Sequence, residues 1–99
     1  MEKMRIEVDL LQLEGATMQD EKIIIPVCEN GIYLFKKQEG GIRAVLRLNA
    51  FPRKTQSQYG ATHIVKRLLT AEEKNRLVSD ENIETPILGS VYPFKERYK

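Results

Sequence analysis

The strongest constraint on the fold is an alternation of side-chain character over residues 42–51. One set of positions is apolar: Ile42, Ala44, Leu46, Leu48 and Ala50. The intervening set is mainly polar or basic: Arg43, Val45, Arg47, Asn49 and Phe51. A period of two residues is typical of a β-strand with one buried face. The pattern therefore predicts a central or near-central strand of an antiparallel sheet, ended by Pro52.

Four more strands are expected, at residues 5–13, 23–28, 32–36 and 61–69, each from an alternating or β-branched apolar run. Pro26 either places the second of these at a sheet edge or marks a bulge in it, because proline cannot donate a hydrogen bond to a ladder. Asn30-Gly31 predicts a tight hairpin between residues 23–28 and 32–36. Gly40-Gly41 predicts the next turn. The remaining connections, at residues 14–21 and 53–60, are expected to be polar loops.

One helix is expected after these strands. Thr70 and Glu73 have the spacing of a capping box, in which each side chain bonds the backbone amide of the other. The helix is predicted over residues 71–78. Thr85-Pro86 then favours extended backbone, and the apolar residues that follow either pack or form one more short strand.

A chain of 99 residues is expected to form a single domain, residues 1–99, because it has no room for two cores. Its parts are an antiparallel sheet (1–69), a helix (70–78) and an extended C-terminal segment (79–99). The predicted fold is mainly β (α+β), as a small, curled five-stranded sheet or a partly open barrel. One short C-terminal helix and an extended tail complete it.

Residue types that support catalysis or metal binding are scarce. Cys28 is the only cysteine and His63 the only histidine, which excludes an intrachain disulfide and a thiolate-only metal site. We interpret Cys28 as a small core residue and His63 as a polar strand residue. No phosphate-binding glycine pattern or calcium-loop spacing occurs. The sequence therefore predicts no catalytic residue, no metal site and no cofactor.

No apolar run approaches the length of a membrane span, and the N-terminal residues lack the apolar core of a secretion signal. We expect a cytoplasmic protein without membrane contact.

Charge is strongly segregated along the chain. Residues 31–69 hold eight basic side chains and one acidic side chain, a net charge of +7, whereas the whole chain has +2. The flanking segments are acidic, at −4 for residues 1–30 and −1 for residues 70–99. A basic segment that also carries four of the seven aromatic residues favours an electrostatic partner.

The first functional hypothesis is a small non-enzymatic domain that binds single-stranded DNA or RNA. Basic groups would attract phosphates and aromatic rings would stack on bases. The candidate binding residues share these two characters and lie in or beside the predicted central strands: Tyr33, Phe35, Arg43, Arg47, Phe51, Arg53, Lys54, Tyr59, Lys66 and Arg67.

The alternative hypothesis is a protein-interaction or structural domain that works as a homo-oligomer or accessory subunit. An edge strand at residues 23–28, an apolar segment at residues 86–94 and the opposite charges of neighbouring segments favour it. On this hypothesis the aromatic residues are packing residues, and the arginines extend from the rim with buried stems.

Overall fold

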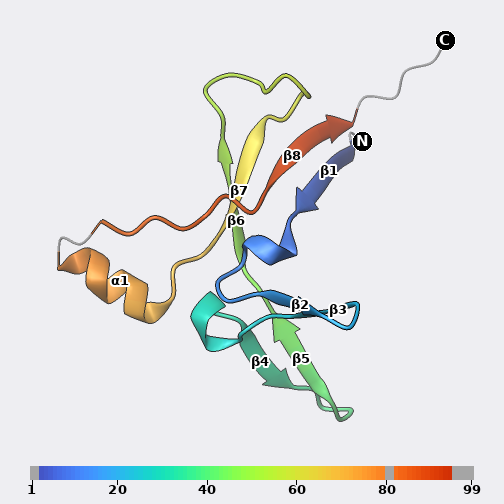
Figure 1. The fold of residues 1–99 in the computed structure, drawn as a ribbon, viewed down its shortest axis with the longest axis vertical. Helices are drawn as coiled ribbons and strands as arrows, with labels where there is room; N and C mark the ends of the chain where they lie inside the picture. The colour runs from blue at the N-terminus through green and yellow to red at the C-terminus, as the bar shows by residue number, and fades with distance from the viewer. Residues whose placement is uncertain (1–2, 80–81, 95–99) are drawn as a thin grey trace.

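The computed structural model describes residues 3–79 and 82–94 (Figure 1). Within these residues the chain is mainly β, its strands pair antiparallel, and one short α-helix follows the strand expected at residues 61–69. The predicted fold class is therefore confirmed. The elements in chain order are β1 (Lys3–Val8), η1 (Leu10–Gln12), β2 (Thr17–Gln19), β3 (Lys22–Ile24), η2 (Cys28–Asn30), β4 (Tyr33–Lys36), β5 (Ile42–Val45), β6 (Leu48–Pro52), β7 (His63–Arg67), α1 (Ala71–Val78) and β8 (Gly89–Phe94).

The largest sheet joins the two ends of the described chain. Its strand order is β1-β8-β7-β6, so the N-terminal strand lies beside the C-terminal one (Figure 1). Every pairing in it is antiparallel. Directly paired residues share a face, and the register collects aliphatic side chains on one side. We call this side the apolar face; it carries Met4, Ile6, Val8, Leu48, Ala50, Val65 and Val91.

Two separate hairpins complete the β structure. β2 pairs with β3 and β4 pairs with β5, and neither hairpin has a third strand among the described residues. The β4–β5 turn contains Gly40 and Gly41 at φ of 93° and 87°, a conformation that glycine adopts readily, as predicted. The strands expected in one sheet are thus distributed over three.

The alternating segment 42–51 forms two strands instead of one. Its pattern continues, but the ladder is interrupted at Leu46 and Arg47, so β5 pairs with β4 whereas β6 pairs with β7. The strand expected at 5–13 also ends early, at Val8. The Asp9 carboxylate accepts the amide of Leu11 at 3.0 Å and caps the 3-10 turn η1, which turns the chain away from the sheet.

The prediction of a hairpin at Asn30-Gly31 is wrong. Gly31, at φ 65° and ψ 31°, ends η2, and β3 pairs with β2 rather than β4. The Asn30 side chain is almost fully buried, and its amide group bonds the backbone of Glu14 as a neighbouring strand would. It accepts the Glu14 amide at 2.8 Å and donates to the carbonyls of Glu14 and Pro26, both at 2.9 Å. These bonds explain why an asparagine lies here without forming a hairpin turn.

Helix α1 matches the predicted residues 71–78 and its capping box is formed. Thr70 Oγ1 accepts the Glu73 amide at 3.2 Å, and a Glu73 carboxylate oxygen accepts the Thr70 amide at 2.8 Å. The C-terminal apolar segment forms β8 in the interior of the sheet, where it pairs with both β1 and β7. Residues 95–99 of the expected extended tail lie outside the described residues.

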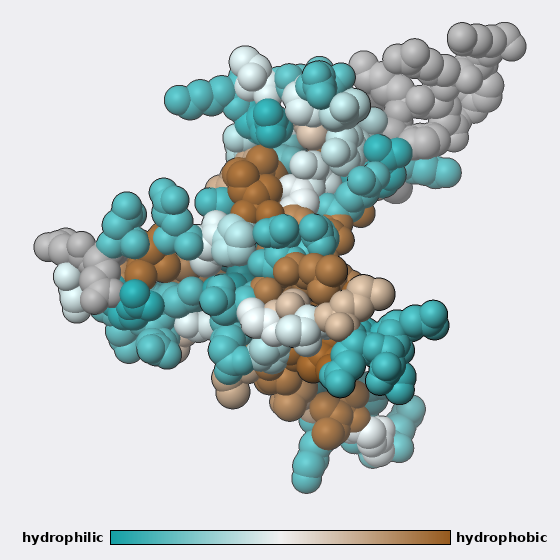
Figure 2. Space-filling view, viewed as in Figure 1, coloured by the Kyte–Doolittle hydropathy of each residue, from teal (hydrophilic) through white to brown (hydrophobic). Residues whose placement is uncertain are grey.

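The buried core is small for the length of the chain. Its apolar members are Leu13, Ala61, Val65, Leu88 and Val91. The Cα radius of gyration is 16.6 Å, whereas a compact domain of this length has about 13 Å. The accessible surface is 8474 Å², against about 5,800 Å² for a compact monomer of this mass. Apolar side chains consequently show as several patches on the face seen in Figure 2.

Candidate functional site

The β4–β5 hairpin brings predicted aromatic and basic residues together on one side. Direct pairing places Phe35 opposite Arg43 and Tyr33 opposite Val45. We call this side the ring face of the hairpin. The rings of Tyr33 and Phe35 are stacked, with centroids 6.3 Å apart and planes inclined by 23°. Both rings are nearly half exposed, at 47% and 46%.

Arg47 joins the ring face from the segment between β5 and β6. Its guanidinium carbon lies 4.5 Å from the centroid of the Tyr33 ring, a cation–π contact. Arg47 therefore lies on the same side as Arg43 and Val45, although the strand is interrupted at Leu46 and Arg47. Four of the ten candidate binding residues meet here: Tyr33, Phe35, Arg43 and Arg47.

The opposite side of the hairpin, which we call its aliphatic face, is also uncovered. Leu34 pairs with Ala44 and Lys36 with Ile42, and Leu34 and Ile42 are 55% and 65% exposed. A two-stranded hairpin alone in water is marginally stable. With apolar side chains exposed on both faces, this hairpin lacks the packing that normally holds such a structure.

The other candidate residues lie elsewhere. Phe51 and Lys66 belong to the four-stranded sheet, on the face opposite the apolar face, where they line a groove of about 280 Å³. Arg53, Lys54 and Tyr59 lie in the β6–β7 loop, at the far end of the molecule from the β4–β5 hairpin (Figure 1). The candidates therefore do not form one continuous surface.

Arg67 does not belong to an exposed basic surface, which corrects its inclusion among the binding residues. It is 4% exposed, and its two terminal nitrogens donate to the two carboxylate oxygens of Glu73 at 2.6 and 2.9 Å. This paired hydrogen bonding lowers the pKa of Glu73 to about 2 and raises that of Arg67. The buried ion pair could not be predicted from the sequence, because an arginine within a run of basic residues is expected at the surface.

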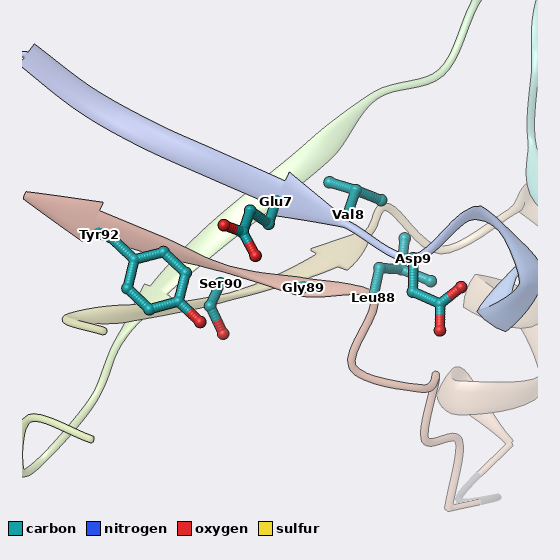
Figure 3. A pocket seen from close by; sticks show the side chains of 7 residues that line it. All are labelled: Glu7, Val8, Asp9, Leu88, Gly89, Ser90 and Tyr92. Carbon is teal, nitrogen blue, oxygen red and sulfur yellow. The ribbon is translucent and has the colours of Figure 1, made fainter. Parts of the chain in front are cut away.

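A shallow hollow of about 270 Å³ lies over β1 and β8 and contains acidic and hydroxyl groups (Figure 3). Glu7 and Ser90 are paired across the strands, and Tyr92 lies on the same face of the sheet. No group of three residues suited to hold a metal occurs among residues 3–79 and 82–94. The hollow has neither a histidine nor a basic side chain in its lining.

Cys28 and His63, the single cysteine and the single histidine of the chain, contact different elements. Cys28 is exposed, contrary to the core position expected for it, and lines a hollow with residues of α1. His63 lies in β7 with its Nδ1 atom 2.8 Å from the Thr62 hydroxyl. The structure therefore provides no contact that would make them a pair.

Comparison with family models, curated proteins and solved structures finds no match for this chain. Among the described residues, the only α-helix has eight residues, and no helix has the length and apolar character needed to cross a membrane.

Proposed function

We propose that this chain is a non-enzymatic subunit of a protein assembly, in which association buries its exposed apolar side chains. One observation carries this proposal. Seventeen large hydrophobic side chains of the described residues are exposed, whereas five apolar residues are buried. Exposed apolar surface on this scale is characteristic of protein interfaces.

The distribution of these side chains favours protein over other ligands. Seven of them lie on two of the sheets: Tyr33, Leu34, Phe35 and Ile42 on the two faces of the β4–β5 hairpin, and Met4, Ile6 and Leu48 on the apolar face of the four-stranded sheet. A small ligand would require a deep concave site, whereas the hollows described above are shallow. Only a surface of protein size can cover groups on several separate sheets at once.

The proposal predicts that the isolated hairpin is unprotected until the chain associates. Amide hydrogen exchange in β4–β5 should be fast in dilute protein and should slow as the protein or a partner binds, because a lone hairpin is marginal. The measurement is exchange followed by mass spectrometry from about 5 to about 200 µM, with light scattering on the same samples. Slow exchange of the hairpin in a strictly monomeric sample would contradict the proposal.

Replacement of the aliphatic face tests the same surface. Leu34→Ser and Ile42→Ser are each expected to weaken association about tenfold, since burial of a large aliphatic side chain contributes about 1.5 kcal/mol or more. The folded monomer should lose little stability, because both side chains are exposed in it. Lys36→Ser, on the same face of the same hairpin, is the matched control and should leave association unchanged.

Binding of single-stranded nucleic acid is a second candidate function, supported by the ring face of the hairpin. Tyr33 and Phe35 expose stacked rings beside Arg43 and Arg47. Rings of this kind stack on bases, and arginines neutralise phosphates. This surface covers only one side of the hairpin and leaves the aliphatic side chains elsewhere unexplained.

The nucleic-acid hypothesis predicts salt-dependent binding through the hairpin. Replacing Arg43 and Arg47 together by glutamine should weaken binding of a fluorescent single-stranded oligonucleotide at least about tenfold at low salt. The matched control replaces Arg53 and Lys54 by glutamine, because they lie at the other end of the molecule. Equal losses in both variants, or no binding at low salt, would exclude the ring face as the binding site.

A further inference from the structure

Strand β1 is an edge strand whose outer side is open. The order β1-β8-β7-β6 places it at one end of the sheet, and among the described residues it pairs only with β8 (Figure 1). Met4 and Ile6 on its apolar face are 60% and 62% exposed. An open edge with exposed apolar side chains favours pairing with a strand of another chain.

The register determines which peptide groups point outward. The Asp9 amide donates to the Leu88 carbonyl at 2.7 Å, so these two residues form a hydrogen-bonded pair that continues the β1–β8 ladder. Bonded and non-bonded pairs alternate in antiparallel sheets. Arg5 and Glu7 consequently direct their peptide groups toward β8. The position of Pro93, opposite a residue of the non-bonded set, agrees, because proline has no amide hydrogen to donate.

The other set of alternating residues in β1 directs its peptide groups to the open edge: Met4, Ile6 and Val8. A second antiparallel strand must bond to these three. When the second strand is another β1 centred on Ile6, each outward-facing residue meets an outward-facing residue, as Ile6 with Ile6 and Met4 with Val8. The backbone of β1 is therefore compatible with itself.

The side chains select this same register. With Ile6 at the centre, Arg5 of one copy lies opposite Glu7 of the other, twice over, in non-bonded pairs where side chains approach most closely. A shift of one pair in either direction sets Arg5 against Arg5 or Glu7 against Glu7, which is unfavourable. Among the registers with correct bonding, only the one centred on Ile6 matches the charges.

We propose that a second copy of this chain docks on β1, antiparallel and centred on Ile6, and joins the two four-stranded sheets into one continuous sheet. This inference rests on the proposed assembly function and names its partner. The dimer places Met4 and Ile6 of both copies side by side on a shared apolar face. It also extends the present contact of Arg5 Nε with Glu7 at 2.8 Å into a group of four alternating charges.

Charge reversal tests the inference. Arg5→Glu alone and Glu7→Arg alone should each weaken self-association at least about tenfold, because each sets like charges opposite one another at two places. The two variants mixed in equal amounts should form a heterodimer, since every facing pair is then of opposite charge. The double variant Arg5→Glu/Glu7→Arg should also associate, to within about threefold of the original chain.

Sedimentation velocity of the full chain, with one component of the mixture fluorescently labelled, measures these affinities. Recovery in the mixture and the double variant cannot come from a misfolded single variant, so the test holds even when one variant is unstable. If the chain associates and both single variants associate equally well, β1 is not the interface, although the proposed assembly function stands. A chain that stays monomeric at about 200 µM overturns the dimer, and the hairpin exchange experiment then decides the proposed function separately.

Discussion

Replacing Gly89 by alanine is expected to destabilise the protein by at least about 3 kcal/mol, a large fraction of the stability of a domain of this size. A Cβ atom built on Gly89 would lie 1.7 Å from the Glu7 carbonyl oxygen and 2.9 Å from the Val8 Cα atom. These are backbone atoms of β1, so no side-chain rotation relieves the clash. Because Gly89 also pairs with Val65 on the other side, β8 cannot move away from β1 without pressing into β7.

Gly41→Ala is the matched control for this prediction. Gly41 has a φ of 87°, which alanine adopts at a cost, but open space surrounds its Cβ position. The stability lost in Gly41→Ala should be about 1 kcal/mol, and it should come only from the backbone conformation. The backbone of Gly89 lies outside the left-handed region, so the stability lost in Gly89→Ala comes only from the steric clash. Urea denaturation followed by circular dichroism at one protein concentration compares the two. Equal midpoints for Gly89→Ala and the original chain would show that β1 and β8 separate easily.

Local patterns predicted local structure well. The capping box of Thr70 and Glu73 identified helix α1 to the residue, because its determinants lie within four positions of one another. The Gly40-Gly41 turn and strand β4 were also predicted correctly, from short-range turn and alternation signals. Each of these elements requires no knowledge of what lies across the sheet.

Pairing between distant segments could not be predicted in the same way. The alternation of residues 42–51 gives no sign of a break at Leu46, because both resulting strands keep the same period. Strand β2 was missed since its turn places Asp20 and Glu21 at φ of 51° and 62°, values that a glutamate seldom adopts. The apolar residues of segment 86–94 indicated a possible strand, but they did not indicate that this strand lies between β1 and β7.

The candidate site shows the same division. Alternation correctly placed Tyr33 and Phe35 on one side of their strand, and the pairing of Phe35 with Arg43 brought basic and aromatic groups together. Alternation also defines which residues share a face, but not whether anything covers that face. The exposure of Met4 and Ile6 therefore had no signal in the sequence, and neither did the burial of Arg67.

Glu73→Gln should destabilise the protein by about 3 kcal/mol at pH 7, because it leaves the buried Arg67 guanidinium without a countercharge. Arg67 and Glu73 side chains are 3% and 18% exposed, so water replaces little of the lost interaction. Glutamine preserves the size of the side chain and one oxygen acceptor. Glu72→Gln is the control: Glu72 is an exposed acid in the same helical turn, and its loss should cost about 0.5 kcal/mol.

The pH dependence distinguishes a lost charge from a lost shape. The pKa of Glu73 falls from 4.5 to about 2 on folding, so its contribution is complete above about pH 5 and declines as acid protonates the folded carboxylate. The difference in unfolding free energy between the original chain and Glu73→Gln should shrink from about 3 kcal/mol at pH 7 to about 1 kcal/mol at pH 2.5. Urea denaturation at four or so pH values measures it. A difference that stays constant with pH would mean that Glu73 acts through packing and the helix cap. In that case the ion pair would not be what ties α1 to β7.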